Sequence, residues 1–231
     1  MFKSAKHFTL IIVLAVSLFL SLGSGPASAG INQWTQIYNG LTGTDVEAVA
    51  IDPATPTTIY AGINDVFRST DGGNNWTQFN NGLPGTWISA LVIDPVTPTT
   101  IYAGTWKGVF RSTDSGNNWI QVNNGLTDLI VRVLAIDTAM IYAGTNYDGV
   151  FRSTDNGNSW TQVSNGLTDT HVNALAIDPV TPTTLYAGTN YAGVFRSTDS
   201  GNNWTQVNNG LTYTGLGDLA IDPVTPTTLY A

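Results

Sequence analysis

The chain has 231 residues, a formal net charge of −8 and no cysteine. An acidic surface of this kind repels phosphate backbones and anionic membrane surfaces, so neither nucleic acid nor a membrane is expected as a partner. The lack of cysteine excludes disulfides, thiol chemistry and thiolate metal ligands. Stability must therefore come from the burial of apolar side chains and from repetition.

The first 29 residues have the pattern of a secretory signal peptide. Lys3 and Lys6 precede an apolar run from Phe8 to Leu22, and Ala27-Ser28-Ala29 matches a small-x-small cleavage site. The apolar run is shorter than the roughly 20 residues that span a bilayer. We therefore expect cleavage after Ala29, no membrane insertion afterwards, and a secreted or periplasmic mature protein made of residues 30–231.

A motif of about forty-three residues is repeated along the rest of the chain. The string STDSGNNWTQVNNGLT around Trp204 recurs with few changes around Trp76, Trp119 and Trp160, and a shorter copy, NQWTQIYNGLT, surrounds Trp34. Successive tryptophans are 42, 43, 41 and 44 residues apart. This period, without helical patterning, is typical of a four-stranded blade of a β-propeller. The sequence therefore predicts an all-β fold with almost no helix.

Each repeat divides into four short strands, which we call A to D. In the last complete repeat we expect strand A at 171–177, B at 184–188, C at 194–198 and D at 204–207, because β-branched and apolar runs are separated there by Gly, Pro, Asn and Asp. A lone strand D at Trp34 precedes four complete repeats, and strands A and B alone follow them. The prediction is a five-bladed propeller or, because the last blade lacks strand C, a larger propeller truncated at the C-terminus.

Four strings match the pattern S-x-D-x-G-x-x-W in full, and we call them the SDGW turns (residues 69–76, 112–119, 153–160 and 197–204). Their pattern and spacing, with the flanking strings AIDPVTPTTLYAGT and GVFRSTD, resemble the Asp-box (BNR) propellers. That group includes sialidases, xyloglucan-cleaving glycosidases, the sortilin receptor domain and photosystem II assembly-factor-like proteins, and the flanking strings are most similar to the last kind. The resemblance implies a propeller whose Asp boxes lie away from the active face.

The polar residues of the SDGW turns are predicted to be structural. Serine and aspartate side chains accept hydrogen bonds from backbone N–H groups in tight turns, the glycine supplies a backbone conformation that other residues resist, and the tryptophan packs between blades. A residue that recurs once per blade at one position serves every blade alike. The aspartates are Asp71, Asp114, Asp155 and Asp199, and the same argument covers Arg68, Arg111, Arg152 and Arg196.

Function is expected where the repeats differ, on the loops of one face. Because strand direction alternates, the D–A loops (39–47, 80–87, 123–130, 164–171 and 208–215) share a face with the B–C loops (63–65, 106–108, 146–149 and 190–193). We call it the variable face. Its irregular aromatic and polar residues suit the binding of a glycan or a protein segment, although drift in unconstrained loops gives the same pattern. The predicted binding residues are Trp87, Trp106, Tyr147, Tyr191, Tyr213, His171, Arg132 and Glu47.

A catalytic role is the alternative interpretation. A glycosidase needs two carboxylates about 5–10 Å apart, and Asp45 with Asp65 or Asp148 is a candidate pair on the variable face. The resemblance to sialidases lacks their arginine cluster, because Arg132 is the only arginine outside the repeat position. The long insertions typical of the xyloglucan-cleaving relatives are missing as well.

The remaining site chemistries are poorly supported. A Ser-His-Asp triad would depend on His171, and no G-x-S-x-G string accompanies it. A single histidine after the signal peptide and the absence of cysteine predict no metal site, and no phosphate-binding loop suggests a cofactor. We therefore predict no catalytic residue and a noncatalytic binding or assembly scaffold. A glycoside hydrolase, sialidase-like or xyloglucanase-like, is the alternative.

Overall fold

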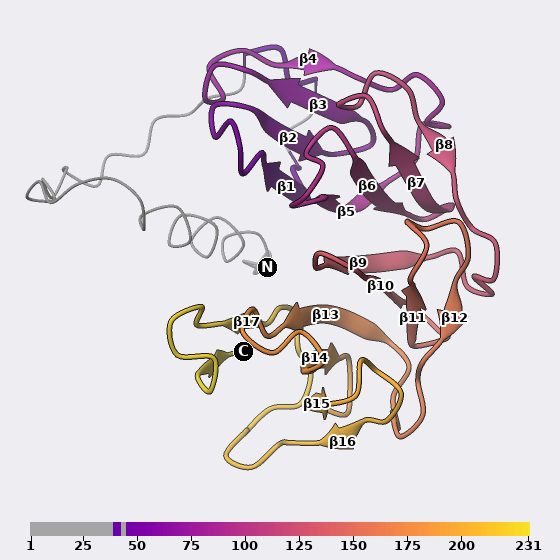
Figure 1. Cartoon of the computed structure of the whole chain (residues 1–231), viewed down its shortest axis with the longest axis vertical. Helices are drawn as coiled ribbons and strands as arrows, with labels where there is room; N and C mark the ends of the chain where they lie inside the picture. The colour runs from indigo at the N-terminus through magenta and orange to yellow at the C-terminus, as the bar shows by residue number, and fades with distance from the viewer. Residues whose placement is uncertain (1–38, 43–44) are drawn as a thin grey trace, which may run out of the picture.

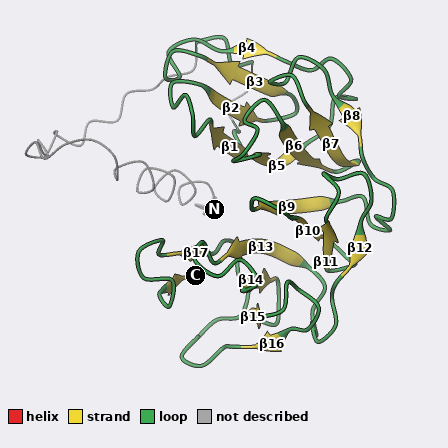
Figure 2. Cartoon of the chain, in the orientation of Figure 1, coloured by secondary structure: helices red, strands yellow, loops and turns green. Residues whose placement is uncertain are grey.

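The computed structural model describes residues 39–42 and 45–231 of the chain. Within these ranges the secondary structure consists of strands, turns and loops, without helix (Figure 2). The predicted signal peptide and the strand expected at Trp34 lie outside the described residues.

The strands form four antiparallel sheets of four strands and one of two. Blade 1 comprises β1 (Ala48–Ile51), β2 (Ile59–Gly62), β3 (Val66–Ser69) and β4 (Thr77–Gln78). Blade 2 comprises β5 (Ile88–Ile93), β6 (Ile101–Thr105), β7 (Gly108–Ser112) and β8 (Ile120–Gln121). Blade 3 comprises β9 (Val131–Ile136), β10 (Ile141–Thr145), β11 (Val150–Ser153) and β12 (Thr161–Gln162). Blade 4 comprises β13 (Val172–Ile177), β14 (Leu185–Thr189), β15 (Val194–Ser197) and β16 (Thr205–Gln206), and the fifth sheet β17 (Ala220–Ile221) and β18 (Leu229–Tyr230).

The sheets are arranged as the blades of a β-propeller. Strands pair in chain order within each sheet, and the sheets follow one another around an arc with strand A innermost and strand D outermost in each blade (Figure 1). This confirms the predicted fold class. Strand D is only two residues long, shorter than the four residues expected, and the backbone N–H of Trp204, at its expected start, bonds to Asn165 O in the preceding D–A loop (2.8 Å).

The apolar core lies between neighbouring blades. Strand B is buried along its whole length in blades 2, 3 and 4, as expected for a strand covered on both faces. Each core cluster joins residues of two blades; one example contains Tyr60 of blade 1 with Ile88 and Trp119 of blade 2. The indoles of Trp119, Trp160 and Trp204 are at most 4% exposed. Such burial of a large aromatic side chain removes about 150–250 Å² of surface from water and favours blade association strongly.

Each buried tryptophan also makes a directional contact with the preceding blade. Trp160 Nε1 donates a hydrogen bond to Val122 O (2.8 Å), and Trp204 Nε1 donates to Val163 O (2.7 Å). The equivalent bond of Trp119 is to Phe79 O (3.0 Å). Because the buried N–H would otherwise lack a partner, these bonds fix the position of each blade against its neighbour.

The SDGW turns are closed by their own side chains. In the first turn, Gly73 N donates to Ser69 Oγ (2.9 Å), and the side chain and backbone N–H of Asn75 donate to the two carboxylate oxygens of Asp71 (2.7 and 2.9 Å). The serine and aspartate bonds recur in the other three turns. The turn therefore presents a fixed backbone shape to the blade beside it.

Arginines of strand C reach that backbone from the preceding blade. Arg68 Nη1 donates to Ser115 O (2.9 Å), and Arg152 Nη1 donates to Ser200 O (2.7 Å). Ser115 and Ser200 both have a φ of 59°, in the left-handed region that non-glycine residues rarely occupy. The left-handed conformation of these two serines thus directs their carbonyl groups toward the arginines of the preceding blade.

One glycine at each complete blade boundary is required because the backbone of the next SDGW turn lies directly against it. Gly125 has a φ of +91°, and a Cβ atom there would lie 2.1 Å from Trp160 O. Gly210 occupies the same repeat position with a φ of +90°, but nothing described lies within 4 Å of its Cβ direction. The two glycines therefore separate the cost of backbone conformation from the cost of the interblade clash.

We expect Gly210→Ala to lower the free energy of unfolding by about 1–2 kcal/mol, the cost of a left-handed conformation for a residue with a Cβ. Gly125→Ala should cost at least about 2 kcal/mol more, because the new methyl group also overlaps a backbone carbonyl of the next blade. Urea denaturation of the two variants measures both values. Equal losses would contradict the proposed role of the blade contact.

The second prediction concerns the stability of the fold at low pH. Hydrogen bonds from Asn75 and Ser69 lower the pKa of Asp71 to about 2, and the pKa values of Asp114, Asp155 and Asp199 are also lowered by hydrogen bonds within their turns. Such carboxylates stabilise the fold above their unfolded pKa, near ~4, and this stabilisation is lost as the pH falls through the folded value. Burial raises the pKa of Asp218, which acts in the opposite direction at one site. The urea midpoint should therefore decline from about pH 4 to pH 2, and a constant midpoint over this interval would contradict the argument.

Candidate functional site

The loops of the variable face are bound to one another across the blades. Gly149 N, in the B–C loop of blade 3, donates to Thr170 O in the D–A loop that enters blade 4 (3.0 Å). Within blade 4, Asn190 N of the B–C loop donates to His171 O, at the end of the D–A loop (3.0 Å). Because backbone groups make these bonds, the side chains that the loops carry are held in fixed relative positions before any ligand binds.

Blade 2 carries the first pair of predicted aromatic residues. The rings of Trp87 and Trp106 are 5.8 Å apart between centroids and inclined by 30°. Trp106 is 54% exposed, whereas Trp87 is partly buried beneath it. The pair therefore presents one open indole supported by a second one.

The boundary between blades 3 and 4 carries a second aromatic cluster. The His171 ring lies between Tyr147 and Tyr191, edge-on to each, at centroid distances of 5.4 and 5.7 Å. Tyr147 and Tyr191 are 58% and 70% exposed. Three residues from three different loops are thus brought together, as the prediction of a shared face requires.

Two aspartates hold the tyrosine loops in place. Asp128 accepts the backbone N–H groups of Ile130 (2.9 Å) and Tyr147 (2.6 Å). Asp169 does the same for His171 (3.0 Å) and Tyr191 (2.7 Å), and it also faces His171 Nδ1 at 3.2 Å. Neither residue belongs to the S-x-D-x-G-x-x-W pattern or was among the predicted binding residues. The string Leu-Thr-Asp, at 126–128 and again at 167–169, was the available signal.

The electrostatics of Asp169 follow from these contacts. Burial by itself would raise the pKa of this carboxyl. The two backbone N–H groups and the His171 ring outweigh burial and hold the pKa below its ordinary value. Asp169 therefore carries a negative charge near neutral pH, and its oxygens are occupied by the loops it supports.

Strand A enters blades 2, 3 and 4 through a β-bulge that re-aims one polar side chain. The register shifts leave three residues without an opposite residue in the strand register of strand B. They are Ser89, Arg132 and Asn173. Arg132 donates to Asn173 Oδ1 (2.7 Å) and to Asn146 Oδ1 (3.0 Å), and Asn173 donates to Leu216 O (2.9 Å). These bonds link strand A of blade 3 to blade 4 and the loop beyond, and they leave the guanidinium of Arg132 exposed.

The remaining predicted binding residues are dispersed. Tyr213 is 76% exposed in the loop before the fifth sheet, and no ring contact joins it to another described aromatic residue. Glu47 lies in blade 1 at the position of Arg132 in blade 3, where its backbone N–H bonds to Gly62 O (3.0 Å). The variable face therefore holds two aromatic clusters and separate polar residues.

The proposed catalytic carboxylates are not joined. Asp65 accepts a hydrogen bond from Gln78 (2.9 Å), and Asp148 accepts one from Thr127 (2.5 Å). Between described residues, no hydrogen bond connects Asp45 with either of them. The hydrogen bonds of Asp65 and Asp148 thus hold the loops that carry them.

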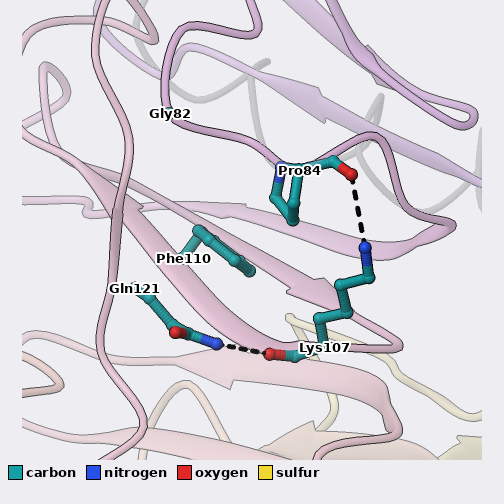
Figure 3. A pocket seen from close by; sticks show the side chains of 5 residues that line it. All are labelled: Gly82, Pro84, Lys107, Phe110 and Gln121. Atoms are coloured by element: carbon teal, nitrogen blue, oxygen red, sulfur yellow. Dashed lines mark hydrogen bonds between the residues drawn. The ribbon is translucent and has the colours of Figure 1, made fainter.

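A shallow cavity of about 360 Å³ lies beside Lys107, lined by Gly82, Pro84, Phe110 and Gln121. Lys107 extends along its edge and donates from Nζ to Pro84 O (3.3 Å), while Gln121 donates to Lys107 O (2.8 Å) (Figure 3). Phe110 is only 4% exposed. Lys107 therefore bridges the D–A loop, through Pro84, and strand D of blade 2, through Gln121.

The described residues, 39–42 and 45–231, contain neither a metal-binding cluster nor a membrane-spanning helix. No group of three or more His, Cys, Asp or Glu side chains there could hold a metal ion. The same ranges contain no helix long and apolar enough to cross a membrane.

Comparison with known proteins gives likeness in structure only. No protein-family model and no curated protein sequence matches the chain. An ancestral GH74 enzyme is 25% identical over 82% of this chain and 28% of its own, with a TM-score of 0.68. The GH74 enzyme of Niastella koreensis is 20% identical over 79% and 34%, with a TM-score of 0.65. YCF48 bound to D1 peptide is 16% identical over 77% and 58%, with a TM-score of 0.54.

These neighbours are β-propeller relatives in shape. The chain spans less than two thirds of the length of each of them. Enzymes and a peptide-bound protein occur among them, so the likeness in fold does not choose between catalysis and binding.

We expect Asp169→Ala to lower the free energy of unfolding by about 2–3 kcal/mol, because it leaves the backbone N–H groups of His171 and Tyr191 without their acceptor. Amide hydrogen exchange at Tyr191 should become faster in this variant. Asp65→Ala is the matched control, since it removes a carboxylate with a single side-chain partner and should change stability by no more than about 0.5 kcal/mol. Equal effects of the two substitutions would contradict the anchoring role of Asp169.

Proposed function

We propose that the chain is a noncatalytic binding or assembly module of the Asp-box (BNR) type, which holds a glycan or a protein segment on its variable face. The observation that carries this proposal is the set of exposed aromatic rings on loops that are already fixed. Trp106, Tyr147 and Tyr191 are each more than half exposed, although each is held by ring contacts with a neighbouring side chain.

The energetic argument concerns preorganisation. Exposed aromatic side chains gain apolar contact area when a ligand covers them, and Tyr and Trp also offer a polar group at the ring edge. Binding normally requires ordering of loops and side chains, which weakens affinity. The backbone bonds at Gly149 and Asn190 and the aspartate anchors remove most of that requirement here.

The fold neighbours are compatible with either class of ligand. One is a YCF48 protein bound to D1 peptide, and others are GH74 enzymes.

We also propose that residues 1–29 direct export and that the module acts outside the cytoplasm, since the basic start, apolar run and Ala27-Ser28-Ala29 form a signal-peptide pattern.

A glycoside hydrolase remains the second candidate because of the GH74 neighbours. The test is the release of reducing sugar from xyloglucan and from sialylated glycans by the purified chain. Our proposal expects none. Release that disappears in Asp45→Asn, Asp65→Asn or Asp148→Asn would make the chain an enzyme and overturn the noncatalytic proposal.

We expect the double variant Trp106→Ala/Tyr191→Ala to bind at least about tenfold more weakly to whichever ligand class is retained, with the free energy of unfolding changed by less than about 1 kcal/mol because both rings are exposed. Affinity is measured by calorimetry against soluble polysaccharides and short peptides. Val180→Ala is the control, since Val180 is 71% exposed in the A–B turn on the opposite face. Unchanged affinity in the double variant would contradict the variable face as the binding surface.

A further inference from the structure

The Tyr147–His171–Tyr191 cluster has an electrostatic setting that the Trp87–Trp106 pair lacks. Asp128 and Asp169 bond to the backbone of the two tyrosines, and Asp148 follows Tyr147 directly in the chain. Three carboxylates therefore lie in or against the loops that carry two exposed aromatic rings. In blade 2 the residue next to Trp106 is Lys107 instead.

Little positive charge offsets these carboxylates. Between described residues, the one ion pair within 4.0 Å is that of His171 Nδ1 with Asp169 Oδ1, at 3.2 Å. Asp128 accepts backbone N–H groups, and Asp148 accepts the Thr127 hydroxyl group. Arg132 is the nearby cation, bound to the amides of Asn146 and Asn173. One guanidinium against three carboxylates leaves the surroundings of the tyrosines negative, as is the whole chain at −8.

The negative face of an aromatic ring attracts cations, and a nearby carboxylate strengthens the attraction. Tyr147 and Tyr191 each use a ring contact with His171, but both remain more than half exposed. A neutral sugar stacked on these rings would gain no net charge attraction from the carboxylates, whose oxygens already accept hydrogen bonds from the protein, and an acidic ligand would be repelled by them. A cationic side chain uses both features.

We propose that Tyr147 and Tyr191 receive an arginine or lysine side chain of a basic segment in a protein partner. This inference rests on the proposed binding function and selects the protein ligand over the glycan. The carboxylates of Asp128, Asp148 and Asp169 attract the segment over several ångströms, which speeds encounter and makes it dependent on salt. The tyrosine rings supply the contact at short range.

The test uses the whole chain and the peptide Ac-Gly-Arg-Gly-Arg-Gly-NH2, with a peptide in which citrulline replaces both arginines. Citrulline keeps nearly the same shape and removes the charge. Calorimetry or chemical-shift titration should give at least about tenfold tighter binding for the arginine peptide at low salt. This preference should shrink by more than half in 0.5 M NaCl, because the Debye length is then about 4–5 Å.

Variants locate the effect. Tyr147→Ala and Tyr191→Ala should each weaken binding of the arginine peptide by about fivefold, whereas Tyr147→Phe and Tyr191→Phe should retain it because phenylalanine keeps the ring face. Asp148→Asn should weaken binding and reduce its salt dependence. Val180→Ala, on the opposite face, should bind the peptide as the parent chain does.

The outcomes separate this inference from the proposed function. Equal binding of the citrulline peptide, or tyrosine-to-alanine variants that bind normally, overturns the cationic ligand. If a neutral oligosaccharide such as cellohexaose then binds and Tyr147→Ala abolishes its binding, the proposed function stands with a glycan as ligand. If neither probe binds and the soluble polysaccharides and peptides fail as well, the proposed function fails too.

Discussion

The structure depends on the contact of each tryptophan with the blade before it. A four-stranded sheet with apolar residues on both faces cannot be stable alone in water, so its faces must be covered by neighbouring sheets. Trp119, Trp160 and Trp204 supply the covering area, and their N–H groups find a backbone carbonyl at a fixed place. Burial of the ring provides most of the association free energy, and the hydrogen bond sets the orientation.

This division of roles explains why the variable face is free to differ between blades. The conserved positions of the repeat, including the SDGW turns and strand B, lie in or beside the blade contacts. The loops at the other face are joined mainly through backbone atoms, as at Gly149 and Asn190, so their side chains carry little of the folding free energy. Aromatic and charged side chains can therefore be placed there for binding at small cost to stability.

The repeat made most of the fold predictable. Strand positions followed from short apolar runs, and β13, β14 and β15 begin within one residue of the expected starts at 171, 184 and 194. The two-residue strand D was not foreseen, and the N–H group at its expected first residue, Trp204, bonds to the preceding D–A loop. Strand alternation alone predicted a shared face for the aromatic residues, and ring contacts join Trp87 to Trp106 and His171 to Tyr147 and Tyr191.

The details of the candidate site were less predictable. The contact of His171 with two tyrosines depends on the curvature between blades 3 and 4, which no local pattern encodes. The bulges that re-aim Arg132 and Asn173 likewise arise where strand A meets the end of strand B. The anchoring role of Asp128 and Asp169 could not be predicted from local sequence, because the tyrosine N–H groups that they accept lie about twenty residues further along the chain.

The uniform blade contact has a consequence for how such a protein changes over generations. Because the tryptophan, the carbonyl that it meets and the arginine of strand C are supplied by the same positions of every repeat, a duplicated DNA segment encoding one period would add a blade whose two surfaces already fit their neighbours. A ring must still close, so only certain totals are tolerated. Within that limit, growth by copying needs no compensating substitutions, and each new copy would arrive with loops on which selection can act separately.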